Sequence, residues 1–145
     1  FQQVITIFET TEHDTLIMIA KANLAKALML LEDFPTAYAR LKEAMLIAVR
    51  IKRQSSILYQ METFTQLANM MKAYMIAAQL YGFILKRSED VGIAFSHGTQ
   101  DQIEAYSAHI QAELGDEDFD SYVTLGKKLS LDSAVALAFT LSSHM

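Results

Sequence analysis

The stretch DFPTAYARLKEAM, residues 33–45, decides the fold because it combines a helix start with a packed apolar face. Asp33 suits the N-cap position, and Pro35 falls in the first turn, where a missing N–H costs nothing. Apolar residues then recur at steps of three and four, which places them on one side of a helix. These residues are Ala37, Leu41 and Ala44.

The same pattern returns forty residues later in AYMIAAQLYGFIL, residues 73–85. In the helix before each stretch, Leu24 corresponds to Phe64 at the same distance. A helix pair repeated every 34 to 40 residues or so, with small residues at the crossing, is typical of an α-solenoid. We therefore predict an all-α fold, an antiparallel helix-pair, tetratricopeptide-like (TPR-like) α-solenoid with C-terminal capping helices.

The repeat phase also predicts how the chain is divided. We expect one TPR-like domain over residues 1–145, with helix-pair repeats in 1–88, a loop in 89–98 and capping helices in 99–145. The phase continues back into FQQVITIF, which favours the second helix of an earlier, truncated repeat over the strand that its β-branched residues suggest. Because the chain begins with Phe1 rather than Met, we expect a fragment of a larger protein.

The composition limits the classes of partner that the chain can bind. The net charge is −5, so no basic surplus is available to hold a nucleic-acid backbone directly. There is no cysteine, which rules out disulfides and thiolate metal sites. The longest uncharged stretch, residues 73–85, is shorter than the ~20 apolar residues of a membrane span. With no targeting signal in view, we expect a cytoplasmic protein without direct contacts to membrane or nucleic acid.

Near the end of the chain, LGDEDFDSYVTLGKKLSLDSAVALAF, residues 114–139, places carboxylates beside lysines. Helix termini explain each of them: Gly115 ends one helix, Asp116 caps the next, and Ser130 caps the last. We therefore predict structural helix ends rather than a catalytic site, and no enzymatic activity. The buried stripe expected in the last helix is Leu131, Ala134, Val135 and Ala138.

This region also resembles a known family ending. The stretch AAQLYG and the tail quoted above resemble the C-terminal end of the TPR-like region in bacterial STAND-type ATPases, which include LuxR-type transcription activators. Similar endings occur in some multidomain adenylate cyclases and kinases. The matching residues are Ala77, Ala78, Leu80, Gly82, Leu114, Gly115, Phe119, Gly126, Leu129, Ser130, Leu131, Ala134, Val135, Ala136, Leu137 and Ala138.

The resemblance implies a sensor or scaffold module whose output domain lies elsewhere in a parent chain. The upstream repeats depart from the TPR pattern, because Ala25 and Thr65 replace the usual glycine of the first helix and the closing proline is absent. The fragment has no phosphate-binding GxxxxGK loop, no GxGxxG and no HExxH. No cofactor is therefore expected.

Two other side-chain pairs are weak candidates for a metal or catalytic site. His109 and Glu113 have the i, i+4 spacing that would let them share a metal, but two ligands without a third favour a solvated pair. Ser96 and His97 are adjacent in the predicted loop, yet no acid or oxyanion feature accompanies them. We therefore predict no metal site and no catalytic residue.

The stronger candidate for a binding site is the concave groove that the resemblance implies. The first helix of each pair would line it. Its composition suits a peptide or a small polar ligand, and the alternative is a solvated groove with no dedicated ligand. Methionines in the helix pairs suit an adaptable groove or, alternatively, irregular core packing. The candidate groove residues are Lys26, Met29, Tyr59, Glu62, Gln66 and Asn69.

These observations predict a non-catalytic protein-interaction or sensor module of a bacterial signalling or transcriptional regulator. The alternative is a small-molecule effector-binding domain that uses the concave groove. Expected partners are a protein, a peptide or a small effector in the groove, together with other domains of the parent chain. The high apolar content also predicts a homo-oligomer that associates through residues 1–20.

Overall fold

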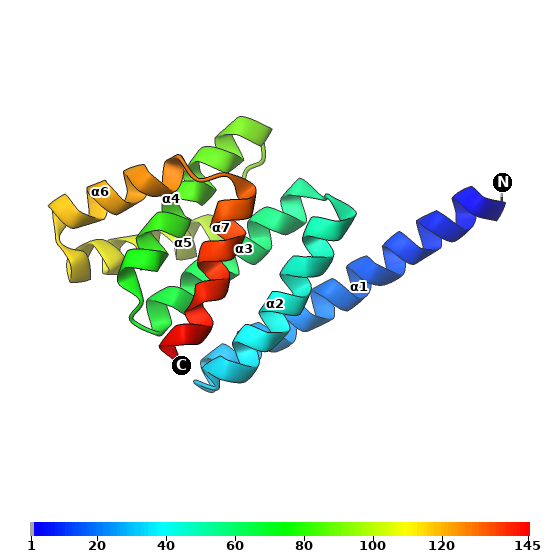
Figure 1. Ribbon diagram of the computed structural model, residues 1–145, viewed down its shortest axis with the longest axis horizontal. Helices are drawn as coiled ribbons and strands as arrows, with labels where there is room; N and C mark the ends of the chain where they lie inside the picture. Colours follow the sequence, from blue (N-terminus) through cyan, green and yellow to red (C-terminus); the bar gives the residue numbers. More distant parts are fainter. Residues whose placement is uncertain (1) are drawn as a thin grey trace. The chain divides into compact units, whose positions relative to one another are not determined.

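A computed structural model describes the backbone of residues 2–145 and the side chains from residue 10 onward. Within that range the chain is all-α, as predicted, and successive helices are largely antiparallel neighbours (Figure 1). The helices are α1 Gln2–Leu30, α2 Phe34–Ile51, α3 Gln54–Met70, α4 Tyr74–Val91, α5 His97–Leu114, α6 Asp116–Lys127 and α7 Leu131–Phe139, followed by the 3-10 helix η1 Thr140–His144.

The chain divides into two compact units, Phe1–Gln60 and Met61–Met145, and the division falls within α3. In the first unit α1 and α2 pack as an antiparallel pair. Two ion pairs fix their register: Lys21 with Glu43, and Arg50 with Asp14 at 2.9 Å. The buried side chains of these two helices are small or flexible and apolar, which allows close approach: Met18, Ala22, Ala25, Met29, Ala37, Tyr38, Leu41, Ala44, Met45 and Ala48.

The first helix is longer than the repeat phase predicted. Residues 2–11 are helical, which confirms the preference for helix over strand in that part of the chain. No turn follows them, however, because α1 runs without interruption over its 29 residues. The prediction of a separate helix from a truncated repeat is therefore wrong in this respect. Neither Gly nor Pro occurs within α1, so nothing interrupts its ladder of backbone hydrogen bonds.

The turn between α1 and α2 recurs between α3 and α4. Glu32 and Lys72 both adopt the left-handed conformation, with φ of 60° and 63°. The residues after them, Asp33 and Ala73, are N-caps with nearly equal backbone angles, and neither makes a side-chain capping bond. Both α2 and α4 have 18 residues. The two turns, forty residues apart, thus have similar backbone conformations.

In the second unit, α4 and α6 cross at two glycines. A Cβ added to Gly82 of α4 would lie 2.1 Å from the backbone oxygen of Val123 in α6. A Cβ added to Gly126 of α6 would lie 1.9 Å from the backbone oxygen of Gln79 in α4. Because neither position has room for a side chain, the two helix backbones touch directly.

The last helix covers α3 within the same unit. The rings of Phe64 in α3 and Phe139 in α7 are 5.9 Å apart. Ala134 and Ala138 are buried as predicted, whereas Leu131 and Val135 are only half-buried, which corrects the expected stripe. The short helix therefore seals the core with its small residues and leaves its larger ones partly in solvent.

Several helix ends differ from the predicted ones. Ser130 caps α7 as predicted, and its Oγ accepts a hydrogen bond from the Ser133 N–H. Asp116 does not cap α6, because Gly115 occupies the N-cap position with φ of 85°. The predicted loop at residues 89–98 is shorter, since α4 continues to Val91 and α5 begins at His97.

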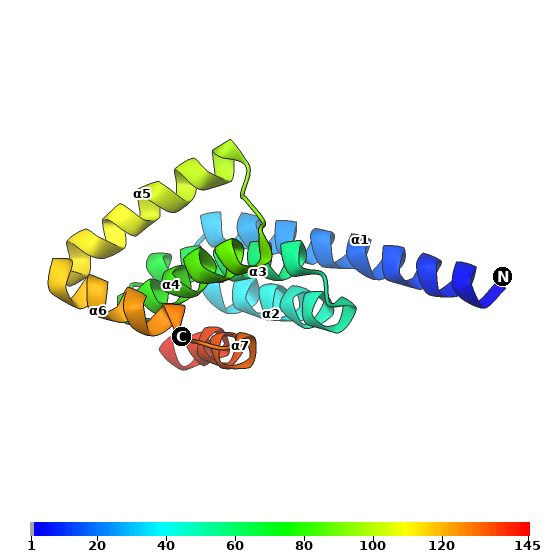
Figure 2. The same cartoon turned by 90° about the horizontal axis from the view of Figure 1, so that it is seen from above.

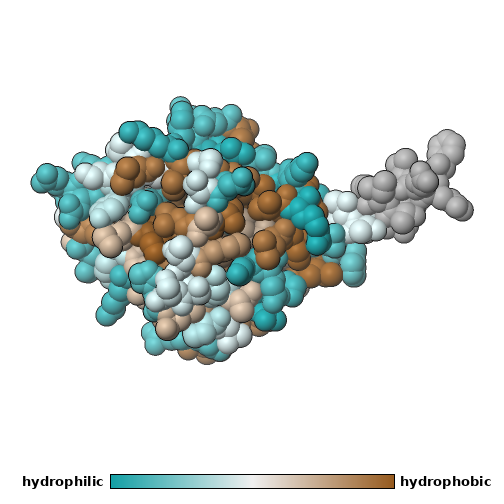
Figure 3. Space-filling view, viewed as in Figure 1, coloured by the Kyte–Doolittle hydropathy of each residue, from teal (hydrophilic) through white to brown (hydrophobic). Residues whose placement is uncertain are grey.

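The surface retains apolar side chains. On the face seen in Figure 3, brown apolar residues lie in patches among hydrophilic ones. No helix in residues 2–145 combines the length and the apolar character needed to cross a membrane.

Candidate functional site

A groove opens between the end of α3 and the middle of α5, with a volume of about 410 Å³. Figure 2 shows α5 leaning away from α4 at its beginning and approaching it toward its end. The whole groove lies in the second unit. We call it the α3–α5 groove; its lining residues are Gln66, Asn69 and Met70 from α3, and Gln102, Ala105 and Tyr106 from α5.

Three carboxamides form the polar part of this groove. The Gln66 amino group donates to the Glu62 carboxylate at 2.7 Å and to the Gln102 amide oxygen at 3.2 Å. The Gln66 oxygen and the Gln102 amino group make no hydrogen bond to another described side chain or backbone group. Since a carboxamide has the donors and acceptors of a peptide unit, these two groups can pair with a peptide backbone.

Tyr106 forms the deeper wall of the groove. Only 8% of its surface is exposed, and its buried hydroxyl has no hydrogen-bond partner among the described residues. Burial raises the pKa of Tyr106 well above its usual range, and the nearby Glu62 and Tyr81 raise it further. The hydroxyl is therefore protonated, and the protein encloses it out of reach of solvent.

One turn before Gln66 on α3, Glu62 is 2% exposed. A buried carboxylate is stable only where hydrogen bonds compensate for its lost hydration, and Gln66 supplies one of them. Glu62 thus holds the Gln66 side chain from within the core and does not itself line the groove.

At one end of the groove, Asn69 connects α3 to α5. The His109 Nδ1–H donates to the Asn69 oxygen at 2.8 Å, because that oxygen can only accept. His109 Nε2 lies 3.6 Å from the Glu113 carboxylate, and the ring packs edge-on to Tyr74 at 5.7 Å. In the described chain no three His, Cys, Asp or Glu side chains come close enough to hold a metal together.

The predicted groove residues divide between the two units. Glu62, Gln66 and Asn69 belong to the second unit; Gln66 and Asn69 line the α3–α5 groove, whereas Glu62 is buried and bonds Gln66. The other three belong to the first unit, where Lys26 is exposed and Tyr59 is half-buried. Met29 is 2% exposed, so it packs in the core and presents no surface to a ligand.

The wall formed by α5 was missed, because its residues were assigned to a capping helix. Gln102, Ala105, Tyr106 and His109 recur at steps of three and four, so they share one side of α5. This stripe of mixed polar and aromatic residues is the signal that would have identified the second wall.

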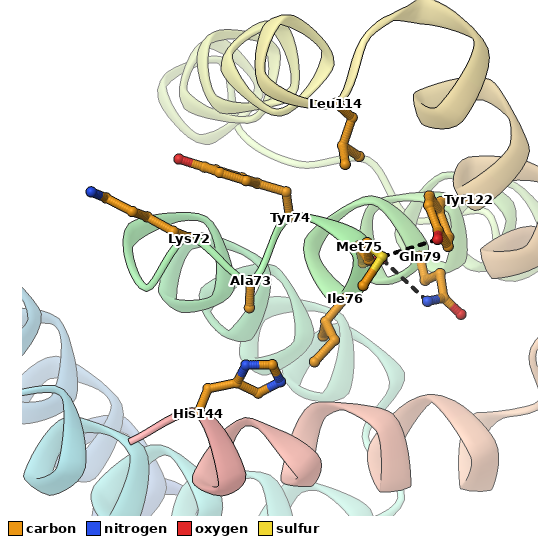
Figure 4. A pocket seen from close by; sticks show the side chains of 9 residues that line it. All are labelled: Lys72, Ala73, Tyr74, Met75, Ile76, Gln79, Leu114, Tyr122 and His144. Carbon is orange, nitrogen blue, oxygen red and sulfur yellow. Dashed lines mark hydrogen bonds between the residues drawn. The ribbon is translucent and has the colours of Figure 1, made fainter.

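A second pocket of about 380 Å³ lies at the start of α4 (Figure 4). It is mainly apolar, with Leu114 and His144 on opposite sides of it. Tyr122 donates a hydrogen bond to the Met75 sulfur at 3.0 Å across one wall. The residues that line it are Lys72, Ala73, Tyr74, Met75, Ile76, Gln79, Leu114, Tyr122 and His144.

The remaining candidates have structural roles. The Ser96 Oγ accepts a hydrogen bond from the Thr99 N–H and caps α5, while His97 is an exposed first-turn residue. Asp116, Glu117 and Asp118 lie in the first turn of α6, where the helix dipole favours negative charge. The acidic stretch is exposed except for the buried Phe119.

No known protein family, no curated protein and no solved structure matches this chain.

Proposed function

We propose that this chain is a non-catalytic interaction module that binds a peptide segment of a partner in the α3–α5 groove. The observation that carries the proposal is the set of polar groups in that groove. The Gln66 oxygen can accept from a peptide N–H, while the Gln102 amino group can donate to a peptide carbonyl. An extended peptide offers both kinds of group at every residue.

The proposed setting is a TPR-like solenoid in a cytoplasmic bacterial signalling or transcriptional regulator. The forty-residue recurrence of the two helical turns supports the repeat architecture, because Glu32 and Lys72 occupy equivalent left-handed positions. The resemblance supports the family, since two of its three matching glycines, Gly82 and Gly126, form the α4–α6 crossing. Other domains of such a regulator would supply its output.

A peptide selection tests the function. A random peptide library displayed on phage is selected on the immobilised chain, and enriched peptides are then measured against variants. Gln66→Ala combined with Asn69→Ala should weaken binding by about tenfold or more, since each lost hydrogen bond is worth roughly 0.5–1.5 kcal/mol. The matched control is Gln100→Ala, an exposed glutamine of α5 that does not line the groove. Failure to enrich any peptide, or equal binding to the groove variant, contradicts the proposal.

The second candidate function is recognition of a small effector, and the apolar pocket at the start of α4 is the observation that favours it. A ligand that binds only the folded state at a hundredfold excess over its Kd stabilises that state by ~2.7 kcal/mol. Thermal-shift screening with small molecules should then give hits that disappear in Met75→Trp, whose larger side chain occupies the pocket. Hits that depend on Gln66 and Asn69 instead would assign the effector to the α3–α5 groove.

A further inference from the structure

The pocket at the start of α4, which we call the α4 pocket, differs in charge from the unit that contains it. Residues 61–145 contain eleven Asp and Glu against five Lys and Arg. The lining of the α4 pocket has no Asp or Glu, yet it includes Lys72 and His144. Glu113, whose charge reaches Tyr74, belongs to α5 and does not line the pocket. A ligand there meets basic side chains without a carboxylate in the same wall.

The two basic side chains have no partner of their own. In the described part of the chain, neither the Lys72 ammonium nor the His144 imidazole forms an ion pair or a hydrogen bond. Lys86 differs, because it pairs with Asp90 at 3.2 Å. The turn between α3 and α4 fixes the backbone of Lys72 at the edge of the pocket, where its N–H donates to the Asn69 oxygen at 3.0 Å.

The interior of the α4 pocket suits a compact apolar group. Its volume of about 380 Å³ falls within the range of roughly 300–1,000 Å³ that is usual for small-molecule sites. Met75, Ile76 and Leu114 supply apolar wall, and the hydrogen bond from Tyr122 to the Met75 sulfur holds one side in place. Figure 4 shows Lys72 and Tyr122 on opposite sides of the pocket. The pocket therefore has a basic end and an apolar body.

We propose that the α4 pocket binds a small apolar carboxylic acid, with its apolar body between Ile76 and Leu114 and its carboxylate toward Lys72 and His144. This inference rests on the second candidate function and adds the chemical class of the effector. The Lys72 ammonium pairs with the carboxylate, and an N–H of the His144 ring donates to it. The ligand thus supplies the negative charge that the lining lacks.

Three acids test the class of ligand: 2-naphthylacetic acid, 4-phenylbutyric acid and 3-cyclohexylpropionic acid. Each is compared with its own primary amide, which keeps the apolar body and removes the negative charge. Binding to the full chain at neutral pH is measured by ligand-observed NMR titration. At least one acid should bind, about fivefold or more tightly than its amide. The difference should narrow in 1 M salt, where the Debye length is only ~3 Å.

Three variants locate the binding. Lys72→Met removes the charge and keeps the length of the side chain, so it should weaken the acid about fivefold and leave the amide unchanged. Lys127→Met is the matched control, because Lys127 is an exposed lysine of α6 that does not line the pocket. Met75→Trp, which fills the pocket, should weaken the acid and the amide alike.

The outcomes distinguish this inference from the second candidate function. If the amides bind as tightly as the acids and both lose affinity in Met75→Trp, the pocket binds small molecules but the preference for acids is wrong. Equal losses in Lys72→Met and Lys127→Met, or an acid that still binds Met75→Trp fully, also overturn the inference, since the binding then lies outside the pocket. If none of the six compounds binds, the inference is overturned, and the thermal-shift screen alone decides the second candidate function.

Discussion

At the scale of single residues, the ring and the hydroxyl of Tyr106 have opposite effects on stability. Its hydroxyl is buried without a partner among the described residues, and burial of such a group without a hydrogen bond is unfavourable. Its ring meanwhile contributes a large apolar surface to the core. The ring therefore stabilises the fold while the hydroxyl opposes it.

Tyr106→Phe should accordingly increase the free energy of unfolding by about 1 kcal/mol, because it removes the unpaired hydroxyl and keeps the ring. Denaturant titration followed by circular dichroism measures the change. Tyr122→Phe is the comparison, since it removes a half-buried hydroxyl that bonds the Met75 sulfur and should change stability little. A destabilised Tyr106→Phe variant would mean that the hydroxyl makes a stabilising bond in the folded protein.

Glu43 gives the first unit a pH dependence. The hydrogen bond from Lys21 lowers the pKa of Glu43 below its ordinary value of 4.5; burial opposes this shift, and the charge of Arg40 adds to it. A lowered folded-state pKa contributes stability above pH 4.5, and this contribution disappears as the pH falls through the folded-state pKa. The side chain is 37% exposed, so solvent screening keeps the contribution under about 1 kcal/mol.

Glu43→Gln should therefore destabilise the chain at neutral pH and have little effect below the folded-state pKa of Glu43. Urea titrations at a series of pH values measure how the free energies of unfolding of the variant and the native chain converge. Glu89→Gln, which removes an exposed glutamate of α4, should leave the stability at neutral pH nearly unchanged. A constant difference between Glu43→Gln and the native chain at every pH would contradict the ion-pair explanation.

Which site residues the sequence could predict depends on their distance along the chain. Helical phase placed Glu62, Gln66 and Asn69 on one side of α3, and that side faces the groove. Gln102 and Tyr106 come about forty residues later, and only tertiary packing brings α5 against α3. Periodicity locates a face within a helix but not the helix that it faces.

At the scale of elements, the α4–α6 crossing depends on two glycines. Gly82 lies against Val123, and Gly126 lies against Gln79, with backbone carbonyls as the nearest atoms. A flexible side chain could move away from an added methyl group, whereas a helix backbone moves only as a whole. The resemblance marked both glycines in the sequence, and the crossing gives the physical reason for them.

Gly82→Ala or Gly126→Ala should each destabilise the chain by about 1–3 kcal/mol, because the added Cβ forces the helices apart. The double variant should lose less stability than the sum of the two single losses, since one displacement of the helices makes room for both methyl groups. Gly98→Ala is the control: nothing lies within 4 Å of its added Cβ, and alanine favours the helix. If the stability losses of the two single variants add in the double variant, or if Gly126→Ala does not destabilise the chain, the helices adjust locally at each glycine and this explanation is wrong.

We predicted the helix ends from residues whose side chains can hydrogen-bond to free backbone groups. The observed end differs from the predicted one where a glycine occupies the N-cap. Ser130 caps α7 as predicted, because its hydroxyl reaches a free N–H of the first turn. Gly115 ends α5 as predicted but also occupies the N-cap of α6, which moves Asp116 into the helix. Two helices that share one residue at their junction leave no room for a separate side-chain cap.

At the scale of the whole chain, a forty-residue period in the sequence coincides with two similar turns, but it did not predict the length of α1. The period appears in the backbone of the two turns, where Glu32 and Lys72 have nearly equal φ. In α1 the same period implied a break that no glycine or proline enforces, so the helix continues. A sequence period therefore fixes equivalent positions more securely than it fixes where a helix begins.

One side of α1 remains uncovered. Four large apolar residues of α1, together with Leu31 directly after it, are 46% to 82% exposed, and the exposed Ala20 and Ala27 lie between them. The opposite side packs in the core, which makes α1 apolar on two sides. The exposed residues, which we call the α1 stripe, are Leu16, Ile19, Leu24, Leu30 and Leu31.

We expect the chain to self-associate through the α1 stripe, because a contiguous apolar surface favours burial against another apolar surface. The sequence predicted association through residues 1–20; the stripe reaches further, to residue 31, and the side chains of residues 1–9 lie outside the described part. Leu16→Gln with Leu24→Gln should shift the mass measured by light scattering toward the monomer without loss of stability, since both leucines are about half or more exposed. Leu46→Gln with Leu125→Gln is the matched control, because it removes two equally exposed leucines on α2 and α6. A monomeric native chain at high concentration, or an equal shift in both double variants, would contradict association through α1.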